Sequence, residues 1–335
     1  MTSRGGRAVA LATALLTALT VFGVIGVAPV EASHLNQGIV VSADPVDNTP
    51  YVMDGHVTAI VTVGDRVIVG GTFHTVRNVG VPADLTRNYI FAYDPVTGQI
   101  DTNFVPQLDG EVETLAPAPD GTSVFVGGVF ANVNGVSNFG LTKLSVGTGQ
   151  RVAGFNATSA GRVRDIEVSG NTLYMGGDIW SVNGVPRARL AAVDATTGVV
   201  DPSFTIGTTA PRVSVDWVAE LAVSPDGSEM TIVGNFSEVD NQPRSQVAVI
   251  DLSGPTAQLA NWSTDAFGAA CSSSFWTYVR DVEYSPDSAY FVIVTTGGPH
   301  YPSLCDSASR WESGQRGAAV AETWVDWTGG DTLTA

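Results

Sequence analysis

The chain has 335 residues and carries 33 acidic against 16 basic side chains, a formal net charge of −17. Lys143 is its only lysine. A surface this acidic repels phosphates, which argues against nucleic acid and an anionic membrane surface as partners. It favours an extracellular protein that its own charge keeps soluble, and the length allows one large domain behind an N-terminal leader.

The first 32 residues have the pattern of a signal peptide. Arg4 and Arg7 supply the positive start, residues 8–27 are apolar, and Val30-Glu31-Ala32 resembles a cleavage site. The apolar run is longer than usual, so an uncleaved membrane anchor stays open as an alternative, and membrane contact is expected only through it. In either case we expect the rest of the chain to be extracellular, and secretion is the prediction.

A four-residue opening recurs about every 55 residues, a period close to that of propeller blades. Its copies begin at Val57, Val112, Val163, Val218 and Val279. A second apolar run follows each opening, and in three copies it ends in a glycine pair such as Gly176-Gly177. Short runs rich in Val, Ile and Tyr between Gly, Asn and Asp predict strands joined by hairpins. Asn134-Gly135 and Asn183-Gly184 predict tight turns, and the glycine pairs inside strands indicate a bulge or a close backbone approach. Each copy therefore predicts a four-stranded antiparallel sheet.

The spacing predicts an all-β fold, a β-propeller of four-stranded antiparallel blades. Five blades are expected at about residues 56–105, 111–156, 162–205, 217–263 and 278–335 of a propeller domain that covers 56–335. Residues 33–55 precede it as a linker with one short strand at 38–42. We expect an incomplete, truncated ring, with a closed ring of five blades as the alternative.

Residues 176–204 read GGDIWSVNGVPRARLAAVDATTGVVDPSF. With the preceding strand they resemble the delta-60 repeat of secreted actinobacterial β-propellers, whose pattern runs V-G-G-x-F-x-x-V-N-G and then R-x-x-L-A-x-x-D-x-x-T-G. Only Ile179 and Trp180 replace the usual phenylalanine and polar residue. The resemblance extends over residues 50–335. It implies a secreted propeller of the quinoprotein-like kind, and blades of this family offer no well-established catalytic residue to carry over.

Two loops carry paired carboxylates. Asp94 and Asp101 flank a Thr-Gly turn, and Asp194 and Asp201 flank another. Such a pair could bind calcium, but a calcium loop of the EF type needs more oxygen ligands and a closing glutamate, so a plain hairpin is the favoured interpretation. The D-x-x-T-G pattern also resembles quinoprotein propellers, whose later tryptophan has no counterpart in register here. No cofactor is therefore expected, and calcium remains the open alternative.

Cys271 and Cys305 are the only two cysteines. An even pair in an exported chain predicts a disulfide, and closing a loop of this length should stabilise the fold by about 3–4 kcal/mol. Tryptophans gather in the same region, namely Trp276, Trp311, Trp324 and Trp327. If exposed, they could stack on sugar rings through their apolar faces, whereas buried ones would fill gaps between blades.

The first strand of each blade lines the central channel of a propeller, so its charged residues are the candidate binding site. The second position of this strand holds Glu113, Arg164 and Arg280, and the third holds Asp165, Glu220 and Asp281. We expect these groups around one channel mouth, where they could bind a polar ligand, a sugar or a cation, or form a girdle of salt bridges. Because side chains alternate along a strand, only one set can face the channel unless a bulge intervenes.

Known catalytic motifs are absent from the sequence, which has no G-x-S-x-G, H-E-x-x-H or C-x-x-C. We therefore assign no catalytic residue and no metal ligand. The hypothesis is a secreted, non-catalytic β-propeller that binds extracellular carbohydrate or protein, or serves as a scaffold. The alternative is a secreted enzyme, glycoside-acting or quinone-dependent, with its site at the channel mouth, because a propeller can assemble paired carboxylates from distant blades.

Overall fold

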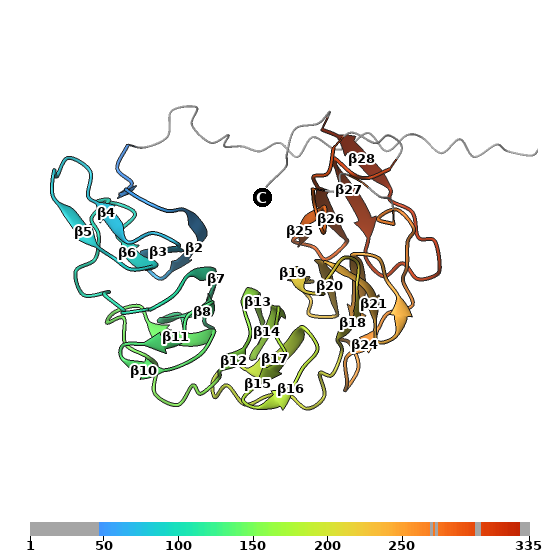
Figure 1. The fold of residues 1–335 in the computed structure, drawn as a ribbon, viewed down its shortest axis with the longest axis horizontal. Coiled ribbons are helices and arrows are strands. Elements are labelled where there is room, and N and C mark those ends of the chain that lie inside the picture. Colours follow the sequence, from blue (N-terminus) through green and yellow to red (C-terminus); the bar gives the residue numbers. More distant parts are fainter. Residues whose placement is uncertain (1–46, 269–270, 272–273, 299–302, 329–335) are drawn as a thin grey trace, which may run out of the picture. The chain divides into compact units, whose positions relative to one another are not determined.

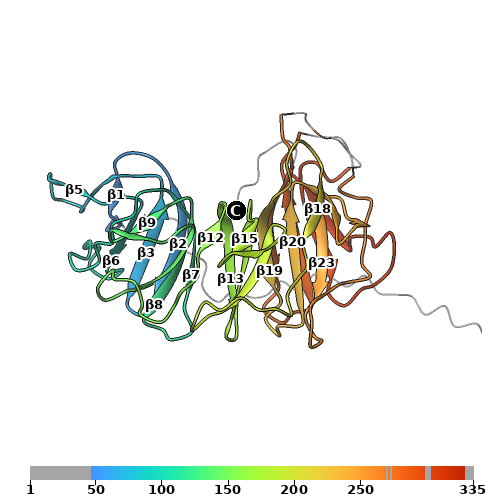
Figure 2. The same ribbon diagram turned by 60° about the horizontal axis from the view of Figure 1, so that its bottom comes forward.

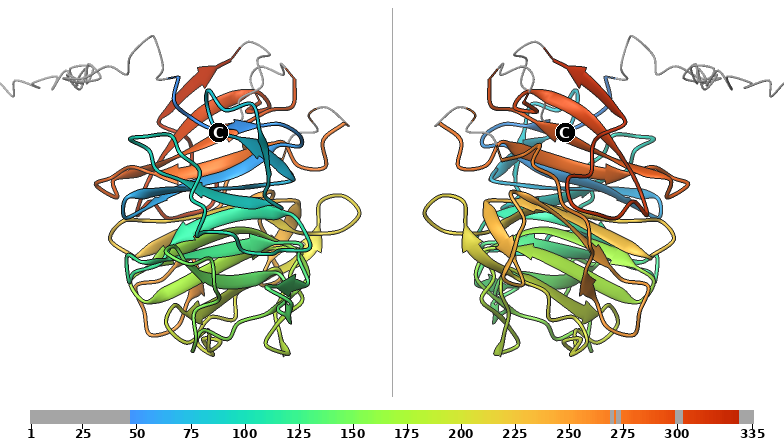
Figure 3. Two further views of the ribbon diagram at one scale, coloured as in Figure 1. Left: turned by 90° about the vertical axis from the view of Figure 1, so that its left-hand side faces the viewer. Right: turned by 90° about the vertical axis from the view of Figure 1, so that its right-hand side faces the viewer.

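The structure is a computed structural model that describes residues 47–268, 271, 274–298 and 303–328. The chain divides into two compact units, Met1–Pro45 and Val46–Ala335. The predicted signal peptide and the predicted strand at 38–42 belong to the first unit and lie outside the described residues. The described part of the second unit consists of strands and turns without a helix, as Figure 3 shows from two sides, and this confirms the all-β prediction.

The same described residues hold no helix with the length and apolar character that crossing a membrane requires. Their strands form five main sheets, called sheets I to V, in which every neighbouring pair is antiparallel. None of them closes into a barrel.

The strands of the main sheets follow in chain order. Sheet I holds β2 (Val57–Val63), β3 (Arg66–Gly71) and β6 (Ile90–Tyr93); sheet II holds β7 (Val112–Pro117), β8 (Ser123–Gly128) and β11 (Leu141–Ser145); sheet III holds β13 (Val163–Ser169), β14 (Thr172–Gly177) and β17 (Leu190–Asp194). Sheet IV holds β19 (Val218–Val223), β20 (Glu229–Gly234), β23 (Val247–Asp251) and β24 (Gln258–Leu259), and sheet V holds β25 (Val279–Tyr284), β26 (Tyr290–Thr295), β27 (Ser307–Glu312) and β28 (Trp324–Trp327).

Four strands were predicted for every sheet, but only sheets IV and V have them. In sheets I to III the fourth strand shrinks to one bridge, such as that between Val193 and Val200. The cause is local. In sheet III the chain turns back at Gly198, and the Asp201 carboxylate then accepts a hydrogen bond from the amide of Ser203 at 2.8 Å. This second turn directs the chain away from β17 before further strand hydrogen bonds can form.

Small side sheets flank sheets I to IV. They are formed by β1 (Tyr51–Val52), β4 (Thr75–Arg77) and β5 (Asp84–Thr86); by β9 (Asn132–Val133) and β10 (Val136–Ser137); by β12 (Ser159–Ala160), β15 (Ser181–Val182) and β16 (Val185–Pro186); and by β18 (Thr208–Pro211), β21 (Phe236–Val239) and β22 (Gln242–Pro243). The hairpins β9–β10 and β15–β16 turn at Asn134-Gly135 and Asn183-Gly184, all at positive φ. These tight turns were predicted from the Asn-Gly pairs.

The first strands of the main sheets lie side by side in the order β2, β7, β13, β19 and β25. They form the inner side of the series in Figure 1, and Figure 2 shows β2, β7, β13 and β19 in the same order. Glycine allows this close approach. A Cβ on Gly176 of β14 would lie 2.7 Å from Cγ1 of Val218 on β19, and one on Gly127 would lie 2.8 Å from Cγ1 of Val163. Val218 and Val163 are completely buried, so each sheet seals its neighbour's core.

Candidate functional site

Every first strand contains a bulge at the same place. In β13 the pairing with β14 skips from Val163 to Asp165, and this leaves Arg164 without a partner in the ladder. The same shift occurs between Val57 and Ala59, Val112 and Thr114, Val218 and Glu220, and Val279 and Asp281. The extra residue is thus the second position in each of the five strands. A bulge re-aims side chains, so the second and third positions need not face opposite ways.

The second glycine of each pair makes room for this bulge. A Cβ on Gly177 would lie 2.1 Å from the carbonyl oxygen of Arg162, the residue before the opening valine, and a Cβ on Gly128 would lie 2.1 Å from that of Glu111. Any side chain there would push the first strand away. The sequence predicted that the glycine pairs mark a bulge or a close backbone approach, and both are present.

The second positions of all five main sheets line one cavity, called the inner cavity, with a volume of about 540 Å³. These residues are Thr58, Glu113, Arg164, Ala219 and Arg280. Glu220 and Asp281, two of the third-position residues, also line it. Five of the six residues singled out in the sequence are therefore brought together, although they come from four different sheets.

Asp165, the sixth predicted residue, lines a neighbouring cavity of about 620 Å³, called the acidic cavity. Its other carboxylates are Glu167, Glu220, Asp281 and Glu283. Glu220 and Asp281 line both cavities. The two hollows therefore meet at these carboxylates, and the six predicted residues belong to one continuous region of the first strands.

The arginines of the inner cavity are held by ion pairs and by aromatic rings. Arg164 lies 2.9 Å from the Asp178 carboxylate and 5.0 Å from the ring centroid of Trp217. Arg280 lies 4.7 Å from the ring centroid of Phe275. Burial lowers the pKa of both guanidiniums from their ordinary value. Contacts of this kind fix the direction of a guanidinium and leave its remaining N–H groups for a ligand.

The carboxylates of the acidic cavity differ in protonation. Burial raises the pKa of Glu167 to about 8. Burial also raises the pKa of Glu220, and the charges of Asp165 and Asp281 add to that shift, so Glu220 is protonated at neutral pH. Burial raises the pKa of Asp165 as well, but only to about 6, because its carboxylate accepts hydrogen bonds from the amides of Leu221 and Ile166, both at 2.8 Å. A neutral acid and a charged carboxylate therefore stand next to each other.

Sequence reasoning missed several residues of this region. Trp217 lines the inner cavity, and Arg162 donates a hydrogen bond to Glu113 at 2.6 Å. Both stand directly before the opening valine of a first strand. That position could have been included in the repeat, because a residue next to a channel-lining strand also reaches the channel mouth.

The paired carboxylates of the loops have other partners. Asp94 accepts hydrogen bonds from the amides of Val96 and Thr97, and Asp194 does the same for Thr196 and Thr197. These bonds lower the pKa of both carboxyls, that of the Thr97 amide being the largest cause for Asp94. The loops have the geometry of the Thr-Gly hairpin. Among the described residues no group of three or more His, Cys, Asp or Glu could hold a metal ion.

The predicted cysteine pair is present. Cys271 and Cys305 form a disulfide with their Cα atoms 5.6 Å apart, and both are buried. This pair is compatible with an extracellular protein. Of the neighbouring tryptophans, Trp311 is fully buried in the core of sheet V, whereas Trp276, Trp324 and Trp327 are exposed. Sugar stacking by these three stays a prediction.

No known protein family and no curated protein matches the chain in sequence. Solved structures resemble it at 14% identity: hydrazine synthase of Kuenenia stuttgartiensis, with a TM-score of 0.46 over 82% of this chain and 66% of that one, and the computationally designed Ika8 protein, with a TM-score of 0.45 over 83% and 64%. The chain thus spans about two thirds of either structure's length. Likenesses this distant assign neither a family nor a function.

Proposed function

We propose that this chain is a secreted, non-catalytic β-propeller of the delta-60 repeat kind, and that its inner cavity binds a polar extracellular ligand. In this proposal sheets I to V are five blades of an incomplete ring, and their first strands surround the axis. One observation carries the proposal, namely that the same strand position in all five sheets lines a single cavity. Radial repetition about an axis brings equivalent residues together in this way.

The chemistry of the inner cavity suits a saccharide. Its ionisable groups are two guanidiniums, Arg164 and Arg280, and the carboxyl groups of Glu113, Glu220 and Asp281, with the indole of Trp217 beside them. Sugar hydroxyls both donate and accept hydrogen bonds, so they can pair with guanidiniums and carboxylates at once. Their ring faces are apolar enough to lie on an indole. A phosphate-rich ligand is disfavoured by the carboxylates in the cavity and by the net charge of −17.

Titration calorimetry with cellohexaose, xylohexaose and chitohexaose tests this proposal. Asp281→Asn keeps the shape of the side chain but removes its charge, and Trp217→Ala removes the aromatic surface. Each should weaken binding by about tenfold or more, the loss expected when a charged hydrogen bond or a stacking contact is removed. Asp65→Asn is the matched control, because the Asp65 side chain is 87% exposed and lies outside the cavity.

Two results would contradict the proposal. One is that none of the three saccharides binds the wild-type chain at millimolar concentration. The other is binding that both cavity variants keep at full strength. A thermal-shift series with calcium chloride alone tests calcium, the cation that the sequence left open as a ligand. If calcium raises the melting temperature and Asp281→Asn abolishes the rise, the ligand of the inner cavity is a cation and not a saccharide.

A further inference from the structure

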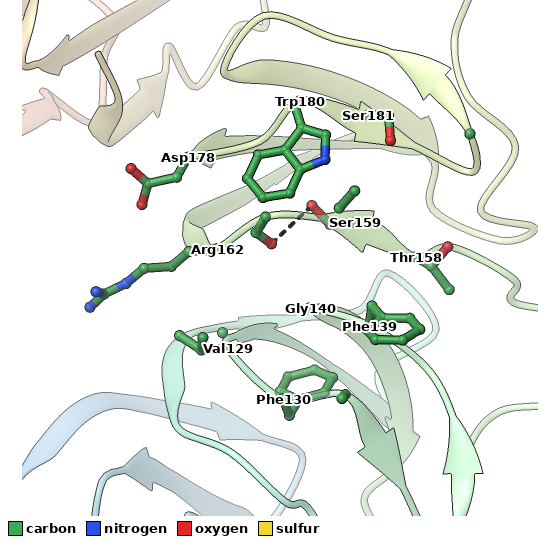
Figure 4. Close-up of a pocket in the computed structure, with 15 residues that line it drawn as sticks. Val129, Phe130, Phe139, Gly140, Thr158, Ser159, Arg162, Asp178, Trp180 and Ser181 are labelled. Atoms are coloured by element: carbon green, nitrogen blue, oxygen red, sulfur yellow. Dashed lines mark hydrogen bonds between the residues drawn. The ribbon is translucent and has the colours of Figure 1, made fainter. Parts of the chain in front are cut away.

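A third cavity, called the aromatic cleft, is lined by residues of sheets II and III and of the segments that follow their second strands. Its volume is about 660 Å³. Figure 4 shows Trp180 on one wall and Phe139 and Phe130 on the other, with Arg162 and Asp178 at one end. The Trp180 and Phe139 side chains are large, yet they are 60% and 52% exposed. Exposing two such apolar side chains to water in one hollow is unfavourable in free energy.

The floor of the cleft is bare backbone. Gly128, Gly140 and Gly161 line it together with Ala160. A Cβ on Gly161 would lie 2.2 Å from the carbonyl oxygen of Asp178, so this position excludes any larger residue. The backbone of Trp180 is held in place, because its amide donates to the carbonyl oxygen of Ala160 at 3.0 Å. The backbone part of the hollow is therefore built into the fold, and Trp180 and Phe139 add its aromatic walls.

Equivalent junctions show that the fold does not need aromatic residues here. One equivalent backbone hydrogen bond occurs in each of sheets I to IV, and it identifies the matching positions. Its amide and carbonyl oxygen belong to Tyr89 and Phe73 in sheet I, Gly140 and Phe130 in sheet II, Arg189 and Ile179 in sheet III, and Gln246 and Phe236 in sheet IV. In this register the counterparts of Phe139 and Trp180 are Asn88 and Ala131 between sheets I and II, and Ala188 and Ser237 between sheets III and IV. Small or polar residues therefore serve the same packing, and the aromatic pair needs another reason.

Polar groups border the aromatic walls. Thr158, Ser159 and Ser181 supply hydroxyls, and Arg162 and Asp178 supply charges of opposite sign. Arg162 pairs with Glu113, and Asp178 pairs with Arg164. These two ion pairs separate the aromatic cleft from the inner cavity, to which Glu113 and Arg164 belong. The cleft is thus a separate site that shares a charged wall with the inner cavity.

We propose that the aromatic cleft is a saccharide-binding site, in which a neutral pyranose ring stacks on the indole of Trp180 against the wall formed by Phe139. The apolar face of a pyranose with equatorial hydroxyls matches an indole, and its hydroxyls extend sideways to the charged and hydroxyl groups at the border. The volume lies within the usual range for small-ligand sites and suits a short oligosaccharide. This site does not depend on the inner cavity holding a ligand.

Titration calorimetry and tryptophan fluorescence with cellohexaose, xylohexaose and chitohexaose test this site. Trp180→Ala should weaken the binding of at least one of these saccharides by about tenfold or more, which corresponds to about 1.4 kcal/mol, and should remove the fluorescence change. Phe139→Ala is the second variant and should weaken binding in the same direction. Tyr51→Ala is the matched control, because Tyr51 is an aromatic residue on β1 that is 52% exposed and does not line the cleft. Circular dichroism and melting curves establish that every variant is folded.

The outcome for Asp281→Asn separates this site from the inner cavity. If the cleft binds, saccharide binding survives Asp281→Asn and Tyr51→Ala but not Trp180→Ala. If Asp281→Asn abolishes binding and Trp180→Ala leaves it unchanged, the aromatic cleft is overturned while the inner-cavity proposal stands. The absence of binding by all three saccharides, or binding that neither variant affects, overturns the cleft as a saccharide site as well.

Discussion

The carboxylate of Asp165 on β13 accepts a hydrogen bond from the backbone amide of Leu221 on β19, at 2.8 Å. Two residues further along, Glu167 accepts a hydrogen bond from the amide of Val223 at 2.6 Å. The first strand of a main sheet is an edge strand, and its outward amides need partners. In this junction the preceding sheet supplies them from its own side chains, so a predicted site residue also holds two sheets together.

Replacing Asp165 with alanine should therefore destabilise the fold. The amide of Leu221 would lose its partner in a partly buried place, and the free energy of unfolding should fall by about 1–3 kcal/mol. Asp165→Asn keeps an acceptor oxygen and should cost less. Urea denaturation of the two variants measures the difference. Equal midpoints for Asp165→Ala and the wild type would mean that this bond contributes nothing to stability.

Stability should also decrease as the pH rises from mildly acidic to mildly basic values. The pKa of Glu167 is about 8 in the folded chain and close to its ordinary 4.5 when unfolded, so between these values the folded state binds the proton more tightly. The free energy of unfolding must therefore fall as pH rises through this window. Asp165 and Glu283 face Glu167 and add to the effect, since their charges raise its pKa further.

Melting temperatures measured from about pH 5 to pH 8 check this dependence. Glu167→Gln removes one of the carboxyl groups whose pKa is raised and should make the profile shallower, with Glu220 and its neighbours supplying the slope that remains. Glu111→Gln, at an exposed position outside the acidic cavity, should leave the slope as it is. A wild-type melting temperature that rises across this range would contradict the assigned direction of the pKa shift.

Loss of the disulfide should destabilise sheet V and its loops. Cys271 and Cys305 are separated by 34 positions, and opening a loop of this length should lower the free energy of unfolding by about 3–4 kcal/mol in the chain-entropy account. The double variant Cys271→Ser with Cys305→Ser, compared with the oxidised wild type in urea, measures the loss. Treatment of the wild type with dithiothreitol should give a similar value, and an unchanged midpoint after verified reduction would refute the prediction.

The junction between sheets III and IV should not tolerate a side chain at Gly176. A Cβ there would lie 2.7 Å from Cγ1 of the buried Val218, and the resulting overpacking should cost about 1–3 kcal/mol. Gly147→Ala is the control, because its Cβ would meet nothing within 4 Å. Thermal melts of the two variants decide the matter, and equal melting temperatures would show that the junction can expand freely.

Local signals in the sequence account for most of the fold. The Asn-Gly pairs at 134–135 and 183–184 predicted turns that adopt the expected positive φ, because few residues other than Asn and Gly enter that region at low cost. The fourth strand was overpredicted in sheets I to III. Its length there is decided by side-chain hydrogen bonds such as that from Ser203 to Asp201, and apolar patterning does not report them.

Part of the candidate site could also be predicted from the sequence. Equivalent positions in the five copies indicated Glu113, Arg164 and Arg280 from the sequence alone, because equivalent residues of a repeated unit occupy equivalent places in the fold. The aromatic cleft gave no comparable signal. Trp180 and Phe139 belong to different sheets, and they face one hollow only because the two sheets pack against each other and Gly140 and Gly161 leave the floor bare. Contacts of that kind depend on tertiary packing.

The bulge in each first strand has a consequence for how such a protein can diversify. It turns the second position of every copy toward the inner cavity, and in sheets IV and V the third position as well, while the valine before them and the glycines opposite keep the packing. Substitutions at Glu113, Arg164 or Arg280 would change the groups that face the proposed ligand, while the buried valines and the glycines of the junctions stay the same. The fold separates the part of each copy that selection must preserve from the part it can rewrite, and new specificities can arise by exchanging pairs of residues.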